Sequence, residues 1–153
     1  MFGALGALKL MKVPLNRNEY SEESKRSVGY SYLGKFYADI EYDCWKCKKR
    51  EIFSAEDQKY TYEVKKLYMW ARRVLCKKCW QEERLLKKQL QDIEKQYCTD
   101  KEVKLNDETF LRNWLKLLEE YPTYGKKGND SRIKFINKHL TSSSKMDSEN
   151  AAL

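Results

Sequence analysis

The sequence "YDCWKCKKREIF", residues 42–53, contains two cysteines separated by two residues and followed by a run of basic side chains. Cys76 and Cys79 repeat this spacing, which gives the pattern Cys-x2-Cys-x28-Cys-x2-Cys. Zinc in structural sites prefers four soft ligands in a tetrahedron, and a two-residue spacer lets both thiolates of a pair reach one ion from a tight turn. The sequence therefore predicts one structural Zn²⁺ per chain, bound by Cys44, Cys47, Cys76 and Cys79.

Three other interpretations of the cysteines are weaker. A thioredoxin-like redox motif needs a single pair in a βαβ setting, which neither pair has. An iron site with the same four thiolates is chemically feasible, and the spacing alone does not separate iron from zinc, although rubredoxin-like turns favour Pro and Gly near the cysteines. The third interpretation is a set of unrelated buried thiols.

The residues around the first pair predict a hairpin. Residues 35–43 alternate between apolar and acidic side chains, as expected of a half-buried strand. The apolar face would carry Phe36, Ala38, Ile40 and Tyr42, and the acidic face Asp39, Glu41 and Asp43. "REIF", residues 50–53, would form the returning strand.

Downstream of the hairpin, helical patterns dominate. Ser54 and Asp57 have the spacing of a helix N-cap, and the helix would bury Tyr60, Val64 and Leu67. "YMWARRVL", residues 68–75, indicates a strand that leads into Cys76. A long amphipathic helix then carries Leu86, Leu90, Ile93 and Tyr97 at helical spacing.

Two further helices follow. One begins near Asn106–Asp107, ends at Pro122 and presents Phe110, Trp114, Leu117 and Tyr121. The last, residues 131–140, offers Ile133, Ile136 and Leu140.

The predicted fold class is α+β: a small zinc ribbon of short antiparallel strands with a long helix and a C-terminal helical extension. The length of 153 residues suits one domain with helical additions. We divide the chain into an N-terminal segment (1–34), the ribbon with its long helix (35–98), the helical extension (99–140) and a polar tail (141–153) that we expect to be disordered.

Residues 42–84 resemble the probable zinc-ribbon family that is defined by two CxxC motifs and found in many bacterial proteins. The resemblance is carried by "CWKC", "IFSAEDQKYTYEVKK" and "RRVLCKKCWQEER", and the matching positions are Phe53, Gln58, Tyr62, Glu63, Arg73, Cys76, Cys79 and Trp80. It implies a zinc-binding fold with the four cysteines as ligands, and no particular activity. Lys48 departs from the pattern, because a ribbon often has Gly after the second cysteine.

The sequence offers no catalytic residue set. Four thiolates close the coordination shell, whereas a catalytic zinc site usually keeps three protein ligands and an open water position. His139 is the only histidine, and we interpret it as an ordinary helix residue. Cys98 has no partner at ligand spacing, and we interpret it as a packing residue or a surface thiol. We therefore expect a non-catalytic protein-interaction or assembly module without a small-molecule substrate.

The charge pattern supports an alternative function. The formal net charge is +8, and residues 44–98 contain fifteen Lys or Arg against eight Asp or Glu. Basic side chains beside exposed aromatic rings suit RNA or single-stranded DNA. The candidate contact residues for nucleic acid or a protein partner are Lys46, Lys48, Lys49, Arg50, Arg72, Arg73, Lys77, Lys78, Trp45 and Trp80. They can equally offset the negative charge of a four-thiolate centre.

The N-terminus, "MFGALGALKLMK", is apolar but lacks the basic start and the small-residue cleavage site of a signal peptide. We expect it to form a first helix or strand that packs on the body, or else a partner-binding segment. No stretch approaches the roughly 20 apolar residues of a membrane span. We expect a cytoplasmic protein with no membrane partner, because thiols stay reduced in the cytoplasm and can serve as ligands there.

Overall fold

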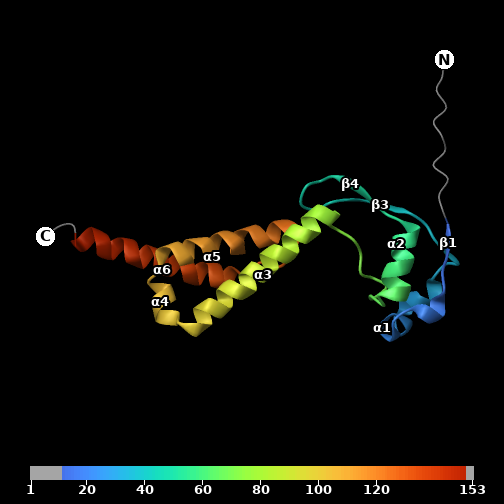
Figure 1. Cartoon of the computed structure of the whole chain (residues 1–153), viewed down its shortest axis with the longest axis horizontal. Helices are drawn as coiled ribbons and strands as arrows, with labels where there is room; N and C mark the ends of the chain where they lie inside the picture. The colour runs from blue at the N-terminus through green and yellow to red at the C-terminus, as the bar shows by residue number, and fades with distance from the viewer. Residues whose placement is uncertain (1–11, 151–153) are drawn as a thin grey trace, which may run out of the picture. The chain divides into compact units, whose positions relative to one another are not determined.

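The computed structural model describes the backbone of residues 12–150 and the side chains of residues 12–142 (Figure 1). The prediction for the apolar N-terminal stretch therefore lies outside the described residues, apart from Lys12. The chain forms two compact units. The N-terminal unit comprises residues 12–44 and 48–74, and the helical unit comprises residues 45–47 and 75–150. This boundary falls inside the range 35–98 that the sequence division keeps together.

The N-terminal unit contains two small antiparallel sheets. β1 (Val13–Pro14) pairs with β2 (Phe36–Tyr37), and β3 (Ile40–Asp43) pairs with β4 (Arg50–Phe53). The second pair is the predicted hairpin, with Ile40 opposite Phe53 and Asp43 opposite Arg50. The other short elements are the 3₁₀ turns η1 (Arg17–Glu19) and η2 (Val28–Tyr32) and the helices α1 (Glu22–Lys25), α2 (Ala55–Lys59) and η3 (Tyr60–Val64).

The predicted single strand over 35–43 is interrupted at Ala38 and Asp39. The carbonyl of Ala38 accepts a hydrogen bond from the Gln58 side chain at 2.6 Å, and the Asp39 carboxylate accepts one from the Ala55 backbone N–H at 2.7 Å. The prediction that Phe36 and Ile40 are buried is wrong. Tyr37 is 5% exposed and joins the core, while Phe36 and Ile40 are half exposed.

The helix after Ser54 begins as predicted, because the Ser54 hydroxyl accepts the Asp57 backbone N–H at 3.1 Å. The prediction that this helix buries Tyr60, Val64 and Leu67 is wrong, because all three side chains are exposed. The helix widens at Tyr60, whose carbonyl accepts the N–H of Lys65 five residues later. The wider turn changes the helical phase, and Tyr62 is buried instead.

The core of the N-terminal unit is aromatic. It is built from Tyr20, Tyr37, Phe53, Ala55 and Tyr62. The Tyr20 and Tyr62 rings stack with centroids 6.0 Å apart, and Phe53 meets Tyr62 edge to face at 6.1 Å. Such ring contacts add to the area that the large side chains bury, which compensates for the few aliphatic residues in this unit.

Residues 68–75 form no strand, so this prediction is wrong. The segment is irregular, and its backbone groups find partners outside any sheet. The Met69 N–H donates to the Ser24 hydroxyl at 2.9 Å, and the Ala71 carbonyl accepts the Tyr62 hydroxyl at 2.8 Å.

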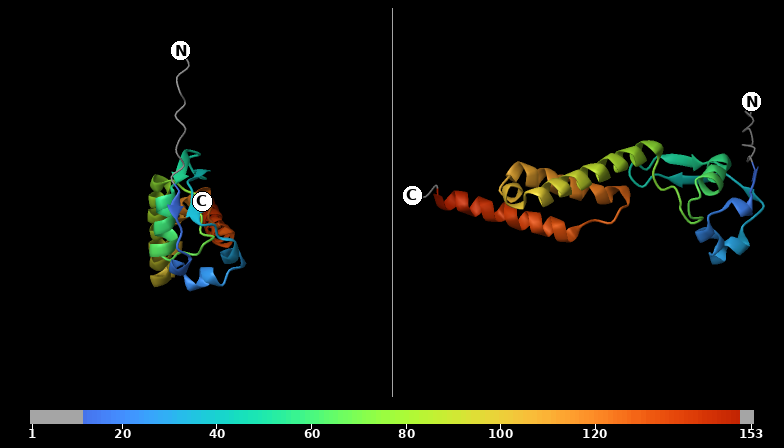
Figure 2. Two further views of the ribbon diagram at one scale, coloured as in Figure 1. Left: turned by 90° about the vertical axis from the view of Figure 1, so that its right-hand side faces the viewer. Right: turned by 60° about the horizontal axis from the view of Figure 1, so that its bottom comes forward.

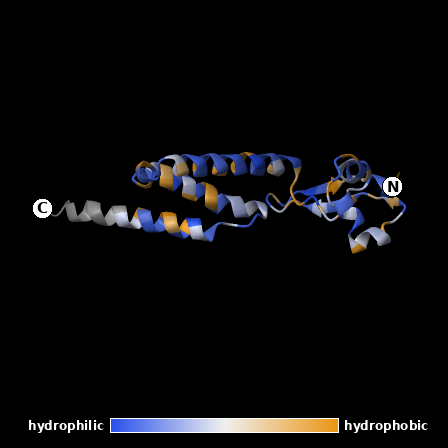
Figure 3. Cartoon of the chain, turned by 90° about the horizontal axis from the view of Figure 1, so that it is seen from below, coloured by the Kyte–Doolittle hydropathy of each residue, from blue (hydrophilic) through white to orange (hydrophobic). Residues whose placement is uncertain are grey.

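The helical unit contains α3 (Lys77–Thr99), α4 (Lys101–Leu105), α5 (Glu108–Glu120), the 3₁₀ turn η4 (Tyr121–Tyr124) and α6 (Asp130–Asn150). In Figure 2, α5 lies beside both α3 and α6. The core consists of residues that the periodicity predicted together with their neighbours: Ile93, Tyr97, Phe110, Leu111, Trp114, Leu118, Ile136 and Leu140. Figure 3 shows that the visible outer side of α3 is mostly hydrophilic, as expected of an amphipathic helix.

The last helix is longer than predicted. α6 continues through residues 141–150, where the sequence suggested a disordered tail. This stretch contains no Gly or Pro, the residues that most strongly oppose helix, so the helix can propagate from its anchored start. Within residues 12–150, no helix combines the length and apolar character needed to cross a membrane.

Candidate metal centre

The β3–β4 hairpin positions the first cysteine pair. Cys44 follows β3 directly, and the turn closes with two backbone hydrogen bonds: Lys48 N–H to Cys44 carbonyl at 2.8 Å and Cys44 N–H to Lys49 carbonyl at 2.9 Å. Lys48 has φ +62°, in the left-handed region that favours Gly. Lys48 therefore adopts the turn conformation that Gly would adopt in its place, at a backbone cost on the order of 1 kcal/mol.

The start of α3 positions the second pair. Cys76 is the N-cap of α3, and its sulfur accepts the Cys79 backbone N–H at 3.4 Å. Cys79 lies in the first helical turn. The helix N-terminus carries partial positive charge, which stabilises a thiolate over a thiol.

The four sulfur atoms lie within 4.8 Å of one another. The Cys47 and Cys76 sulfurs are 3.8 Å apart, too far for a disulfide bond. A tetrahedron with metal–sulfur bonds of about 2.3 Å has sulfur–sulfur edges of about 3.8 Å. Cys44, Cys76 and Cys79 are buried and Cys47 is exposed. The structure thus brings together the predicted ligands in a cluster that could hold a metal ion.

The two residues between Cys44 and Cys47 contact the η4 turn. The Lys46 ammonium donates to the Thr123 hydroxyl at 2.5 Å and lies 4.5 Å from the centre of the Tyr124 ring. Trp45 lies against Gly125, where an added Cβ would come within 1.9 Å of the indole. These contacts hold the turn between the first two cysteines on the helical unit.

Thr123, Tyr124 and Gly125 support this turn but were not predicted as part of the site. Gly125 has φ +74° and ends η4, where its N–H donates to the Pro122 carbonyl at 2.9 Å. The turn-rich stretch "PTYGKKG" is the only sequence signal for this site, because Gly commonly ends a helix in the left-handed conformation.

Most of the predicted contact residues in the N-terminal unit already have acidic partners. Lys49 pairs with Glu51 at 3.0 Å, and Arg50 pairs with Asp43 at 3.2 Å. Arg73 pairs with Asp57 at 2.9 Å and lies over the Phe53 ring at 4.4 Å. Lys48 and Arg72 are exposed, and neither forms an ion pair within the part of the chain that the structure describes.

In the helical unit, Trp80 lies on α3 and is about half exposed, with the Arg84 guanidinium 4.9 Å from its ring centre. Lys78 is 4.0 Å from Glu82, one helical turn away. Lys77 is exposed and makes no ion pair with any described residue. The predicted contact residues are therefore divided between the two units and include several that are engaged internally.

The two remaining polar side chains of interest lie away from the sulfur cluster. The His139 ring meets Phe135 edge to face on α6, with centroids 4.6 Å apart. Cys98 is exposed near the end of α3. Neither His139 nor Cys98 belongs to the cluster of side chains that could hold a metal ion.

The burial of one carboxylate on α3 was not anticipated. Glu83, on the same helix as Cys79, is buried and lies 4.0 Å from the Lys126 ammonium. Burial, and a hydrogen bond to this carboxylate, raise the pKa of Tyr121. No sequence signal marks this group, because Glu83 lies within a run of charged residues.

Comparison with known protein families finds a match that covers the four cysteines. Residues 38–88 match a family model described as a probable treble clef domain, which is zinc-finger-like. The matched range includes all four clustered cysteines, the hairpin and the first half of α3. No curated protein and no solved structure matches the chain significantly.

Proposed function

We propose that the four cysteines bind one zinc ion per chain as a structural site, and that the protein is a non-catalytic protein-interaction or assembly module. The clustering of the four sulfurs within 4.8 Å carries the metal part of this proposal. The match of residues 38–88 to a zinc-finger-like family favours zinc over iron. Reduced thiols need a reducing compartment, which we take to be the cytoplasm.

The donor set supports a structural rather than a catalytic ion. Four thiolates fill a tetrahedral shell and leave no position for water or substrate. The only histidine, His139, packs on Phe135 in α6 and is not among the clustered ligands. The zinc would instead fasten the hairpin to the start of α3, so that metal binding contributes directly to folding.

Exposed apolar side chains support an interaction role. In the N-terminal unit, Val28 and Tyr32 are more than 80% exposed, and Phe36, Ile40, Ile52 and Trp70 are about half exposed. Single exposed apolar residues are ordinary, but a concentration of them in one small unit is typical of a surface that binds a partner.

Elemental analysis of the purified protein tests the metal site. We expect one zinc per chain, and loss of that zinc in a Cys76→Ser variant. Cys98→Ser is the matched control, because Cys98 is an exposed cysteine outside the cluster. Protein purified under reducing conditions without chelator that contains no zinc would refute the proposal, as would iron in its place.

The alternative function is binding of RNA or single-stranded DNA. It is favoured by a hollow on the surface of the helical unit, which Trp80 lines together with Arg84, Lys87, Lys88 and Lys126. An aromatic face next to several cations can stack on a base and neutralise phosphates.

Salt-dependent retention of the protein on heparin or on a mixed RNA pool tests this alternative. Retention that is lost in an Arg84/Lys87/Lys88→Glu variant would support binding at this hollow, because phosphate contacts depend on such cations. Retention that is lost in a Lys48/Lys49/Arg72/Arg73→Glu variant would support binding at the contact residues predicted from the sequence instead. If only Lys48, Arg72 and Lys77 contacted phosphates, the slope of log K against log salt would be about −2 for a single strand. Capture of one protein partner that is insensitive to salt would favour the interaction role instead.

A further inference from the structure

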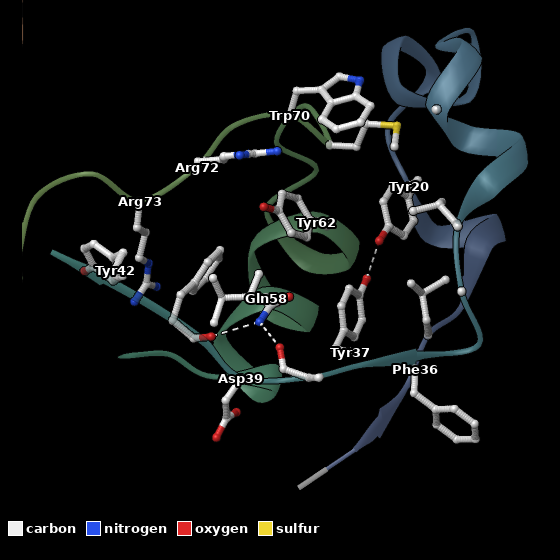
Figure 4. A pocket seen from close by; sticks show the side chains of 18 of the residues that line it. Tyr20, Phe36, Tyr37, Asp39, Tyr42, Gln58, Tyr62, Trp70, Arg72 and Arg73 are labelled. Carbon is white, nitrogen blue, oxygen red and sulfur yellow. Dashed lines mark hydrogen bonds between the residues drawn. The ribbon is translucent and has the colours of Figure 1, made fainter. Parts of the chain in front are cut away.

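A groove of about 780 Å³ lies within the N-terminal unit (Figure 4). We call it the aromatic groove, because its lining includes Tyr20, Tyr37, Tyr42, Phe53, Tyr62 and Trp70. Its size is within the range of known ligand sites, and its lining is mostly apolar with a few polar groups, as is usual for binding sites.

The two sides of the groove differ in structure. One side is the run 36–42, which comprises β2, the interruption at Ala38 and Asp39 and most of β3, and every residue of this run lines the groove. The other is formed from the irregular segment 69–73, from which Met69, Trp70, Arg72 and Arg73 line it. A run of seven residues spans at most roughly 20 Å, and a lining of this length suits an extended peptide better than a compact small molecule.

Trp70 is held in place while half of its surface remains exposed. The indole N–H donates to the Ser27 hydroxyl at 3.0 Å. The ring lies against Gly29, where an added Cβ would be 2.3 Å from the indole carbon Cζ2. A ring that is fixed before binding loses little conformational freedom on contact, and Trp is enriched among residues that dominate binding energy.

The tyrosines on the floor have their polar groups satisfied inside the unit. The Tyr62 hydroxyl donates to the Ala71 carbonyl at 2.8 Å. The Tyr37 hydroxyl is hydrogen-bonded to the Tyr20 hydroxyl at 2.7 Å and lies 3.1 Å from the Glu63 carboxylate, to which it can donate. The floor therefore offers aromatic surface to a ligand without requiring new hydrogen bonds from it.

The charged side chains that line the groove determine which ligand charge it favours. Of the four charged residues that line the groove, Arg73 pairs with Asp57, Glu41 lies 3.8 Å from Arg50, and Asp39 accepts the Ala55 N–H. Arg72 is exposed and forms no ion pair within the described residues. Arg72 is thus a lining cation without a carboxylate partner among the described residues, and its guanidinium is complementary to a carboxylate. Asp39 keeps its own negative charge, so the attraction is local to Arg72.

We propose that the aromatic groove binds an extended, acidic peptide segment of a protein partner, with an aromatic or large aliphatic side chain seated against Trp70 and a carboxylate on Arg72. This inference rests on the proposed interaction role and specifies its surface and the chemistry of its partner. Tyr32, 83% exposed, and the half-exposed Phe36 and Ile40 also line the groove and provide apolar contacts along its length.

The test uses the full chain and three synthetic peptides of about seven residues, matched to the length of the run 36–42. The first alternates Asp and Phe, the second Lys and Phe, and the third Asp and Ser. Each carries a neutral dye, and binding is measured by fluorescence anisotropy. We expect the Asp–Phe peptide to bind at least about tenfold more tightly than either of the others.

Variants locate the binding site. Arg72→Glu and Trp70→Ala should each weaken binding of the Asp–Phe peptide about tenfold, because one reverses the complementary charge and the other removes the apolar contact. Gly29→Ala should weaken it by displacing the indole. Arg26→Glu is the matched control for charge, since Arg26 is exposed in the same unit but does not line the groove, and it should leave the affinity within about twofold.

Equal binding of the Lys–Phe peptide would overturn the proposal, as would an affinity that is unchanged by both Arg72→Glu and Trp70→Ala, or tighter binding of a peptide of residues 1–11. RNA that competes with the Asp–Phe peptide at the groove would also overturn it. Zinc is measured on the same samples. A zinc-loaded chain that does not discriminate among the peptides refutes the groove alone, whereas a chain without zinc refutes the proposed metal site.

Discussion

Replacement of Gly125 by alanine should destabilise the helical unit and loosen the turn between the first two cysteines. Gly125 has φ +74°, a conformation that disfavours a Cβ. The new Cβ would also lie 1.9 Å from the Trp45 atom Cε3 and 2.5 Å from Cζ3, so the indole has to move. Trp45 directly follows the proposed ligand Cys44.

The expected cost has two parts. The left-handed backbone costs alanine about 1 kcal/mol relative to glycine. Trp45 is 52% exposed, so about half of its surface is covered, and the share lost on displacement corresponds to about 1–2 kcal/mol at roughly 25 cal/mol per Å². We expect Gly125→Ala to lower the free energy of unfolding by about 2–3 kcal/mol and zinc affinity by about tenfold, as for other changes next to a metal's ligands.

Urea unfolding followed by far-ultraviolet circular dichroism measures the stability, and competition with a chelator measures the affinity. Gly128→Ala is the control, because its Cβ would meet only Pro122 Cγ at 3.1 Å and Asp130 Oδ1 at 3.6 Å. In a Trp45→Ala background, Gly125→Ala should cost only the backbone part, about 1 kcal/mol. Equal costs in both backgrounds, or a cost no larger than that of Gly128→Ala, would refute this reasoning.

Three further changes test the two cores and one helix start. Ile136→Ala, at a fully buried position, should lower the free energy of unfolding by about 2–5 kcal/mol, and the same change at the partly buried Ile133 by less, as measured in urea. Burial and the hydrogen bond to Tyr20 raise the pKa of Tyr37 above its ordinary 10.0, so the neutral hydroxyl stabilises the fold fully below about pH 10 and progressively less above it. Tyr37→Phe should therefore make the urea midpoint fall less steeply between pH 9 and 11; an unchanged slope would contradict this. Ser54→Ala should cost about 1 kcal/mol and Ser54→Asp should restore most of it, which circular dichroism of urea-treated samples can check.

Local sequence signals predicted the elements that position the cysteines. The hairpin around Cys44, the cap at Ser54 and the long helix after Cys76 all depend on interactions between residues close in the chain. The stripe Leu86, Leu90, Ile93 and Tyr97 was correct because one continuous helix preserves a single periodicity over its length. The fold class and the clustering of the metal ligands could therefore be predicted from the sequence.

The faces of the short elements could not be predicted in the same way. The alternation over 35–43 placed Phe36 inside, yet the interruption at Ala38 and Asp39 depends on Gln58 and Ala55, which are distant in sequence. A widened turn at Tyr60 likewise shifted burial to Tyr62. In elements of two to five residues, one contact from elsewhere outweighs the intrinsic pattern.

The basic residues after Cys44 show how the same limit applies to function. In sequence they form one cluster of positive charge, which suggested a single contact surface or a counterweight to the thiolates. In the structure these residues have separate roles. Lys46 contacts Thr123 and Tyr124, Lys48 has a left-handed backbone conformation in the turn, and Arg50 forms an ion pair with Asp43 across the hairpin. A cation already held by an internal partner adds little to the attraction of an external anion unless that partner is displaced. Charge density along the chain therefore overstates the positive surface near the cysteines. Arg72, outside this cluster, is exposed beside the aromatic groove and forms no ion pair with any described residue.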